Sequence, residues 1–266
     1  MKRLTKTLKG LWEIAKNPWL LNKVLEQDDV WFKTLEKRYG LTNTFPVINC
    51  KQFFKKDSLN TFGFLGGGSL PTDILLLKSL AASIENCSYF EIGTWRGESV
   101  INVADAAKEC YTLNLSKQDI LDLGLNEKYA DLHAFFSKGK ENITHLHGNS
   151  LNFDFTGLNK KFDLIFIDGD HHYEMVKNDT KRVFESLVHD NTIVVWHDYA
   201  HTPEQVIGEV MAGIYEGVPA DQRKHLYHVS NTMCAIYIKG DFDTYSLEYP
   251  DTPIHKFRLD ISLEDL

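Results

Sequence analysis

The sequence is poor in positive charge and in cysteine, and it contains no long apolar run. Its 37 Asp and Glu residues outnumber its 29 Lys and Arg residues, and the formal net charge of -8 argues against a nucleic-acid partner. The cysteines, Cys50, Cys87, Cys110 and Cys234, lack C-x-x-C spacing, so we expect small apolar side chains in a reducing cytoplasm. There is no run of about 18 apolar residues and no signal-peptide pattern, so we expect neither a membrane span nor export.

Length and composition indicate one main domain with an appendage. The 266 residues, 43% of them hydrophobic and 25% charged, suffice for one substantial core. We expect a helical extension and connector at 1–69, the main domain at 70–240 and a tail at 241–266. Within the tail, the alternating residues 255–263 are expected to add an edge strand or to pair across a homodimer. The acidic balance favours a small-molecule or glycan substrate.

The stretch 87–100 is the segment around which the rest of the chain is organised. Tyr89, Phe90 and Ile92 predict a buried strand, and a helix is predicted over 99–107. Between them, Gly93 permits a tight or left-handed turn. The exposed amides at the start of such a helix suit an anionic or carbonyl-bearing ligand.

The glycine spacing in this turn argues against a dinucleotide. A pyrophosphate-binding turn has the pattern G-x-G-x-x-G, whereas here Glu91, Gly93 and Gly97 form the pattern acidic-x-Gly-x-x-x-Gly. This pattern resembles motif I of the class I S-adenosylmethionine-dependent methyltransferases. The resemblance implies that Glu91, Gly93, Thr94 and Gly97 bind the methionine half of the cofactor. The alternative is an ordinary strand-to-helix turn.

The same resemblance assigns residues to the ribose and the adenine. The second strand, 110–116, ends with Asn114 where the family carries an acidic residue that accepts hydrogen bonds from the ribose hydroxyls. A neutral acceptor is weaker than a charged one, so the affinity for the cofactor is expected to be lower. Asn149 and Ser150 follow the third strand and are placed at the adenine edge. Alternatively, they only cap that turn.

Two further strands end in polar residues. The apolar run 162–167 predicts a central strand buried on both faces, and it is followed by Asp168 and His171. The strand 192–196 is followed by His197 and Asp198. Neighbouring strands lie about 4.8 Å apart, so these polar residues are expected to meet where open α/β sheets bind their ligands.

This second group resembles the methyltransferases that modify oxygen atoms of small molecules and sugars, of the methyltransferase domain family 24 type. In that resemblance Asp168, His171 and His197 are the catalytic residues. Asp168, His197 and Asp198 are the candidate ligands of a divalent metal ion. His197 stands where a hard oxygen ligand is usual, and this favours His197 as a direct base over a metal-dependent mechanism.

The end of the main domain predicts the sheet topology. Strands at 226–230 and 234–238 resemble the antiparallel hairpin that distinguishes methyltransferases from dehydrogenases. We therefore expect a Rossmann-like, doubly wound, mostly parallel seven-stranded sheet with a C-terminal antiparallel hairpin. Two alternatives stay open: a nicotinamide-dependent oxidoreductase, which the glycine spacing and hairpin oppose, and a non-catalytic binding protein, which the departures at Asn114 and His197 would allow.

The first 39 residues have the apolar spacing of helices, which Pro18 interrupts. The apolar residues are Leu4, Leu8, Leu11, Trp12 and Ala15, and the basic residues among them are Lys2, Arg3, Lys6, Lys9 and Lys16. We expect a lid, or a helix docked on the main domain or on a second subunit. The alternative is a weak peripheral contact with a membrane.

Overall fold

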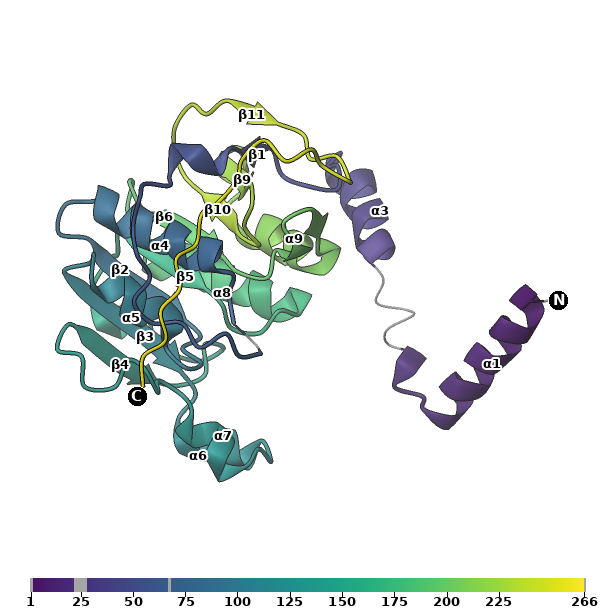
Figure 1. Ribbon diagram of the computed structural model, residues 1–266, viewed down its shortest axis with the longest axis horizontal. Coiled ribbons are helices and arrows are strands. Elements are labelled where there is room, and N and C mark those ends of the chain that lie inside the picture. The colour runs from purple at the N-terminus through teal and green to yellow at the C-terminus, as the bar shows by residue number, and fades with distance from the viewer. Residues whose placement is uncertain (1, 22–27, 67, 266) are drawn as a thin grey trace.

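The computed structural model describes residues 2–21, 28–66 and 68–265, which build a nine-stranded β-sheet covered by helices on both faces and a separate antiparallel pair of strands, β7 and β8 (Figure 1). The helices are α1 (Lys2–Lys16), α3 (Asp28–Tyr39), α4 (Pro71–Ser83), α5 (Glu98–Ala104), α6 (Lys117–Asp122), α7 (Glu127–Asp131), α8 (Tyr173–Ser186) and α9 (Gly208–Gly217), with short 3-10 helices η1 (Cys50–Gln52), η2 (Thr156–Leu158) and η3 (Arg223–His225). The strands are β1 (Val47–Ile48), β2 (Ser88–Ile92), β3 (Glu109–Asn114), β4 (Ile143–His147), β5 (Leu164–Ile167), β6 (Ile193–Trp196), β7 (Ala200–Thr202), β8 (Gln205–Val206), β9 (Leu226–Val229), β10 (Ala235–Tyr237) and β11 (Thr244–Tyr245). Across these described residues, no helix is both long and apolar enough to cross a bilayer.

The main sheet has the strand order β11-β1-β9-β10-β6-β5-β2-β3-β4. Five neighbouring strands in this order, β6, β5, β2, β3 and β4, run parallel to one another. Strand β10 is antiparallel to both β6 and β9. The predicted Rossmann-like sheet of seven strands with a C-terminal antiparallel hairpin is thus confirmed, and β1 and β11 extend it by two short strands.

The alternation of side chains along the central strands divides the core in two. Phe90 and Ile92 of β2 pack with residues of α8 and α9, whereas Tyr89 packs on the opposite face with residues of α4 and α5. In β5, Ile165 faces the first of these layers and Phe166 the second. Helices on both faces require apolar side chains at every position, and this explains the unbroken apolar run of β5.

The segment before residue 70 is joined to the sheet domain more closely than a separate extension would be. Val47 and Ile48 are fully buried, and β1 pairs in parallel with β9. Helix α3 packs on α9, where the Asp28 side chain accepts a hydrogen bond of 2.7 Å from the Gly208 amide. The residues around Val47 were expected only as a connector, because two strand residues are too few for a detectable period.

The tail does contribute an edge strand, but at a position other than the expected residues 255–263, whose alternative pairing across a homodimer stays a prediction. Those residues form no strand, and their apolar side chains are largely exposed, for example Ile261 at 73%. The edge strand of the tail is β11 instead, antiparallel to β1. Because β11 already occupies the edge of β1, the alternating residues farther along do not pair with β1.

Candidate active site

The turn after β2 is shaped by two glycines with left-handed backbones. Gly93 has φ +96° and Gly97, the N-cap of α5, has φ +81°. A β-carbon built on Gly93 would lie 1.9 Å from the carbonyl oxygen of Asp168 at the end of β5. Glycine is therefore required at position 93 both by its backbone angle and by the close approach of the neighbouring strand end.

The side chains of Glu91 and Thr94 brace this turn from inside. Glu91 is fully buried and accepts hydrogen bonds from Tyr89 at 2.8 Å, Ser99 at 2.9 Å and Thr112 at 2.8 Å. Burial raises the pKa of Glu91 to about 8, although the three hydroxyl donors act in the opposite direction. Thr94 shares a short hydrogen bond with Thr112. Direct contact of Glu91 or Thr94 with a cofactor stays a prediction.

The residues assigned to ribose and adenine lie at the ends of β3 and β4, which are adjacent strands. Asn114 is half-buried and donates from Nδ2 to the Leu115 carbonyl at 3.2 Å, which leaves its Oδ1 as an acceptor. Asn149 is exposed, and its Oδ1 accepts from the Leu151 amide at 2.9 Å. Ser150 hydrogen-bonds Asp179. Asn149 thus caps its own turn, as the alternative interpretation had it, and an adenine contact stays a prediction.

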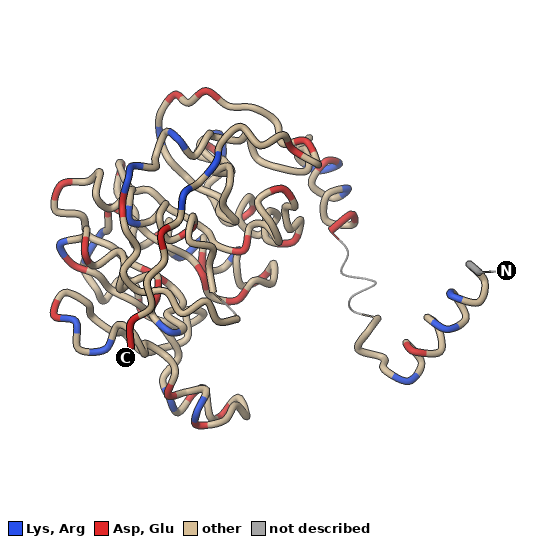
Figure 2. The backbone as a smooth tube through the Cα atoms, viewed as in Figure 1, with Lys and Arg blue, Asp and Glu red and all other residues tan. Residues whose placement is uncertain are grey.

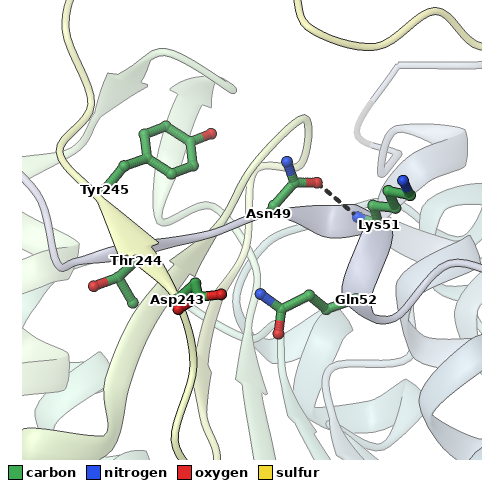
Figure 3. A pocket seen from close by; sticks show the side chains of 6 residues that line it. All are labelled: Asn49, Lys51, Gln52, Asp243, Thr244 and Tyr245. Carbon is green, nitrogen blue, oxygen red and sulfur yellow. Dashed lines mark hydrogen bonds between the residues drawn. The ribbon is translucent and has the colours of Figure 1, made fainter.

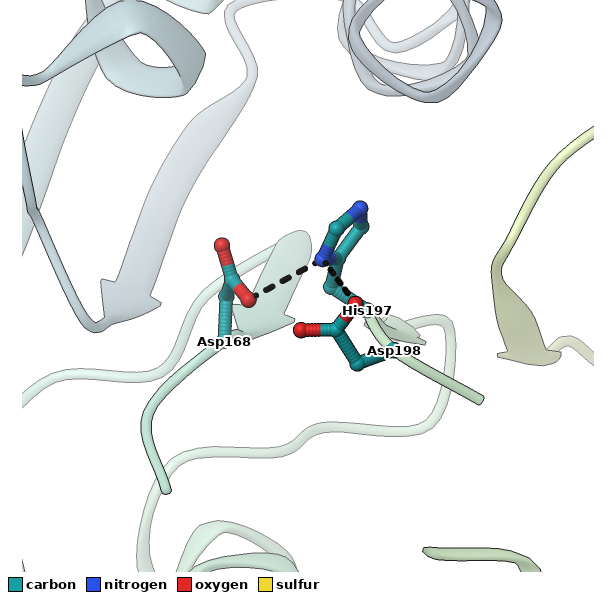
Figure 4. Close-up of side chains that lie close together, drawn as sticks. All are labelled: Asp168, His197 and Asp198. Atoms are coloured by element: carbon teal, nitrogen blue, oxygen red, sulfur yellow. Dashed lines mark ion pairs between the residues drawn. The ribbon is translucent and has the colours of Figure 1, made fainter. Parts of the chain in front are cut away.

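The ends of β5 and β6 bring Asp168, His197 and Asp198 together (Figure 4). Ile167 and Trp196 are register partners, so the residues that follow them are neighbours. His197 Nδ1 lies 3.2 Å from Asp168 Oδ1 and 3.3 Å from Asp198 Oδ1. Asp198 has φ +49°, an uncommon backbone for a residue with a side chain, and such outliers concentrate at functional sites.

His171 completes this group, which we call the strand-end cluster: Asp168, His171, His197 and Asp198. His171 Nε2 lies 3.0 Å from Asp198 Oδ2 and 3.8 Å from Asp168 Oδ1. Its side chain is 49% exposed, so it is the member of the cluster that solvent and a ligand reach most easily. The hydrogen bond to Asp198 raises the pKa of His171 despite partial desolvation.

Asp73 contacts the ring nitrogen of His197 that faces away from Asp168 and Asp198, and it was not among the expected site residues. It lies in the first turn of α4, is fully buried, and its Oδ2 lies 3.1 Å from His197 Nε2. It also accepts from the backbone amides of Leu70 at 2.7 Å and Met233 at 2.8 Å. The available clue was a carboxylate at the start of a nearly all-apolar helix.

The charges of the strand-end cluster are mutually dependent. Burial by itself lowers the pKa of His197, but Asp168, Asp198 and Asp73 outweigh it and raise this pKa well above its usual value. Burial by itself raises the pKa of Asp198, but His171 and His197 outweigh it and lower the pKa of this carboxyl below its usual range. The raised pKa favours the imidazolium form of His197, in which both ring nitrogens can donate to the carboxylates on either side.

The donor set of the strand-end cluster also fits a divalent ion. One ligand atom each from Asp168, His197 and Asp198 lies within 4.8 Å of the others. With the Nε2 proton directed at Asp73, Nδ1 of a neutral His197 would be the coordinating atom, the arrangement in which a carboxylate orients a metal-bound imidazole. Two carboxylates and an imidazole suit manganese, iron or zinc better than magnesium.

A surface cavity lies away from these residues. It measures about 510 Å³ and is lined by Asn49, Lys51, Gln52, Asp243, Thr244 and Tyr245 (Figure 3). These residues belong to the β1–β11 edge of the sheet, whereas the strand-end cluster lies at its centre. None of the expected site residues contributes to the cavity.

Comparison with known proteins gives a family match for the central part of the chain. Residues 90–199 match the family model described as "Methyltransferase domain". No curated protein matches the sequence. The matched segment contains both the glycine turn and the strand-end cluster, so the two groups of motifs belong to one domain.

Three solved structures illustrate the range of similarity. A Staphylococcus aureus protein provisionally assigned as a caffeoyl-CoA O-methyltransferase has 17% identity and a TM-score of 0.45, with coverage of 85% of this chain and 98% of that one. The S-adenosylhomocysteine-bound methyltransferase PaMTH1 of Podospora anserina has 18% identity and a TM-score of 0.42, with coverage of 64% and 83%. A Bacillus halodurans protein provisionally assigned as a methyltransferase has 17% identity and a TM-score of 0.36, with coverage of 47% of this chain and only half, 50%, of that one.

The sequence resemblance and the family match agree on the segment from Phe90 to Tyr199. The strand order and the antiparallel β9–β10 hairpin agree with the expected topology. Residues 90–199 are therefore similar to a methyltransferase domain, as the resemblance to the class I S-adenosylmethionine-dependent methyltransferases predicts.

Proposed function

We propose that this chain transfers a methyl group from S-adenosylmethionine to a hydroxyl oxygen of a sugar, a glycan or another small metabolite. One observation carries the proposal: the glycine turn after β2 packs directly against the strand end that bears Asp168. The predicted cofactor turn and the groups able to move a proton are thus adjacent. Methyl transfer to oxygen requires this adjacency, since the acceptor must lose its proton beside the donor.

The residues around the turn fit the methyl donor. Gly93 and Gly97 keep the backbone free of side chains between β2 and α5, and the free acceptor of Asn114 suits a ribose hydroxyl. Bound S-adenosylmethionine would supply an electrophilic methyl group on a sulfonium sulfur. The protein's own task is to position the acceptor oxygen and to remove its proton.

We assign proton removal to His171, oriented by Asp198. Their separation of 3.0 Å is that of a histidine base held by a carboxylate, and the half-exposed ring of His171 is open to a substrate. His197 is 6% exposed and lies among three carboxylates. We therefore give His197 the role of holding Asp168 and Asp198 in place, rather than the role of base favoured by the sequence pattern.

A metal-dependent variant of this mechanism is supported by the donor set described above. Asp168, Asp198 and a neutral His197 would hold the divalent ion, and such an ion would lower the pKa of a bound hydroxyl. In that variant Asp73 keeps the second proton of His197 in place, so that Nδ1 stays available. The two variants differ in their response to a chelator.

Calorimetry with S-adenosylmethionine and S-adenosylhomocysteine, with and without Mn²⁺ or Mg²⁺, tests the first half of the proposal. Both ligands are expected to bind. A panel of sugars, phenols and other hydroxyl compounds then tests the second half through release of S-adenosylhomocysteine. Binding of neither ligand, or quenching of protein fluorescence by NADH, would contradict the assignment and favour one of the alternatives left open by the sequence.

A further inference from the structure

Helix α1 exposes a continuous apolar face. One side of the helix carries Leu4, Leu8, Leu11 and Trp12. The three leucines are spaced by four and three residues, and Trp12 comes directly after Leu11, so the four side chains share one face. Their side chains are between 58% and 68% exposed. Figure 1 shows α1 well separated from the sheet and the helices that cover it. No other part of the described chain packs against these four side chains and buries them.

The opposite face of α1 is basic. At 100° per residue, Lys6, Lys9 and Lys16 fall on the half of the helix turned away from Leu4 and Leu8. The segment contains five Lys or Arg residues and a single Glu, although the whole chain has a net charge of -8. Figure 2 shows this concentration of blue on α1, against the mixed red and blue of the sheet domain.

Trp12 lies near the boundary between the two faces. The Lys16 ammonium group lies 5.1 Å from the centroid of its ring. An indole paired with a cation is typical of the zone between acyl chains and headgroups, where one part of the ring is apolar and the other wet. Lysines beside it extend their stems over apolar surface and keep the charge in water.

The apolar face and the opposite basic face together favour one kind of binding partner for α1. A protein groove would bury Leu4, Leu8 and Leu11 but would leave the opposite lysines in solvent, where they add little. A second copy of α1 would bring two basic helices together, and their charges would repel. An anionic bilayer uses both faces, because the apolar side chains enter the acyl region while the lysines meet the phosphates.

We propose that α1 lies in the plane of an anionic phospholipid bilayer and attaches the methyltransferase domain to its surface. The helix enters the boundary between headgroups and acyl chains by its leucine face and does not cross the membrane. A helix of 15 residues with few apolar anchors gives reversible binding that depends on ionic strength. This inference is independent of the substrate proposed above.

Flotation of the full chain with two kinds of vesicle tests the proposal: phosphatidylcholine alone, and phosphatidylcholine in which about a third of the lipid is phosphatidylglycerol. We expect binding to the anionic vesicles and little to the neutral ones. Raising the salt concentration from about 0.1 M to about 1 M shortens the Debye length from about 10 Å to about 3 Å, and the bound fraction should fall.

Variants locate the contact. Leu8→Glu should reduce the affinity for anionic vesicles at least tenfold, and the double variant Lys6→Glu, Lys9→Glu should remove the preference for anionic over neutral vesicles. Leu123→Glu is the matched control, since Leu123 is an equally exposed leucine, at 67%, outside α1. Its binding should equal that of the unchanged chain. All variants should keep the same thermal unfolding, because α1 contributes no buried apolar residue.

Three results would overturn the proposal. The first is equal binding to neutral and anionic vesicles, or to neither. The second is unchanged vesicle binding by Leu8→Glu. The third is a dimer in analytical ultracentrifugation that Leu8→Glu dissociates while vesicles capture neither protein, since a second copy would then cover the leucine face.

Discussion

The β-carbon that Gly93 lacks would lie 1.9 Å from the carbonyl oxygen of Asp168. The two residues end adjacent parallel strands, and the Asp168 amide donates to the Ile92 carbonyl at 2.8 Å just before the turn. The turn that the sequence indicates as the cofactor site and the carboxylate that it indicates as catalytic are therefore one packed unit. A side chain at position 93 would therefore displace the backbone of Asp168.

Gly93→Ala tests this unit. The methyl group cannot fit without moving Asp168, and a left-handed backbone adds about 1–3 kcal/mol of strain for a residue with a side chain. We expect a lower urea midpoint and loss of S-adenosylmethionine binding in calorimetry. Gly66→Ala is the control, since a β-carbon on Gly66 meets no atom within 4 Å. A Gly93→Ala protein with normal stability would refute the packing argument.

Asn114→Asp tests the ribose assignment. A charged acceptor at the end of β3 should tighten S-adenosylmethionine binding by up to about tenfold, because a hydrogen bond to a carboxylate is stronger than one to an amide. Calorimetry measures the change, with unfolding curves as the control for stability. Weaker binding in an equally stable protein would place Asn114 away from the hydroxyls.

A chelator separates the two mechanisms at the strand-end cluster. We expect turnover to survive chelation and His171→Gln to lower the rate by about 10²–10⁴ with cofactor affinity intact. His197→Gln should also lower the rate, through misplacement of Asp168 and Asp198. If the chelator abolishes turnover, Mn²⁺ restores it and Asp168→Asn loses both the ion and the activity, the metal-dependent variant is correct.

Asp73→Asn tests the support of His197. An amide nitrogen in place of Oδ2 would face two donors, the Leu70 amide and His197 Nε2. The imidazole ring of His197 would then lose the acceptor that holds its orientation. We expect a loss of about 10–100-fold in kcat/KM and a lower pKa of His197 in NMR titration. Asp57→Asn, which alters a partly exposed ion pair with Lys78, is the control. An unchanged titration of His197 would argue against the assigned role.

The attachment of α3 to α9 is expected to depend on pH through Glu216. Partial burial alone would raise its pKa, but hydrogen bonds from Lys177 at 2.8 Å, from Tyr173 and from Tyr39 of α3 at 2.9 Å lower it to about 2. A depressed pKa stabilises the fold above the unfolded-state value of about 4.5, and this contribution is lost as the pH falls toward 2.

Glu216→Gln should therefore lower the free energy of unfolding by about 1–2 kcal/mol near neutral pH, with a smaller difference at about pH 3. Urea unfolding at both pH values measures it. Glu185→Gln, which alters an exposed pair with Lys181 at 3.7 Å, should have little effect at either pH. A difference for Glu216→Gln that does not change with pH would contradict the assigned interaction.

The parts of the fold that the sequence predicts are those with strong local patterns. The apolar run of β5 and the glycine turn after β2 can each be recognised within a dozen residues of sequence. The meeting of Asp168 with His197 also follows, because the ends of neighbouring parallel strands share one edge of the sheet.

What escaped prediction depends on partners far away in the chain. Val47 and Ile48 become a strand only because β9 offers an edge to them. Asp73 becomes a site residue only because α4 packs so that its first turn reaches His197, 124 positions later. The charge state of His197 likewise arises from three carboxylates on three segments, and no local spacing encodes it.

The position of β1 between β9 and β11 has a practical consequence. A protein begun at residue 70 would lack β1 and leave one edge of β9 unpaired, and a protein shortened to the matched residues 90–199 would lack β10 and leave one edge of β6 unpaired. Bare strand edges of this kind recruit other strands and lead to aggregation. Segments from both sides of residues 90–199 thus cover the edge of the sheet together, and the smallest stable unit of this protein is larger than the segment that matches the methyltransferase family.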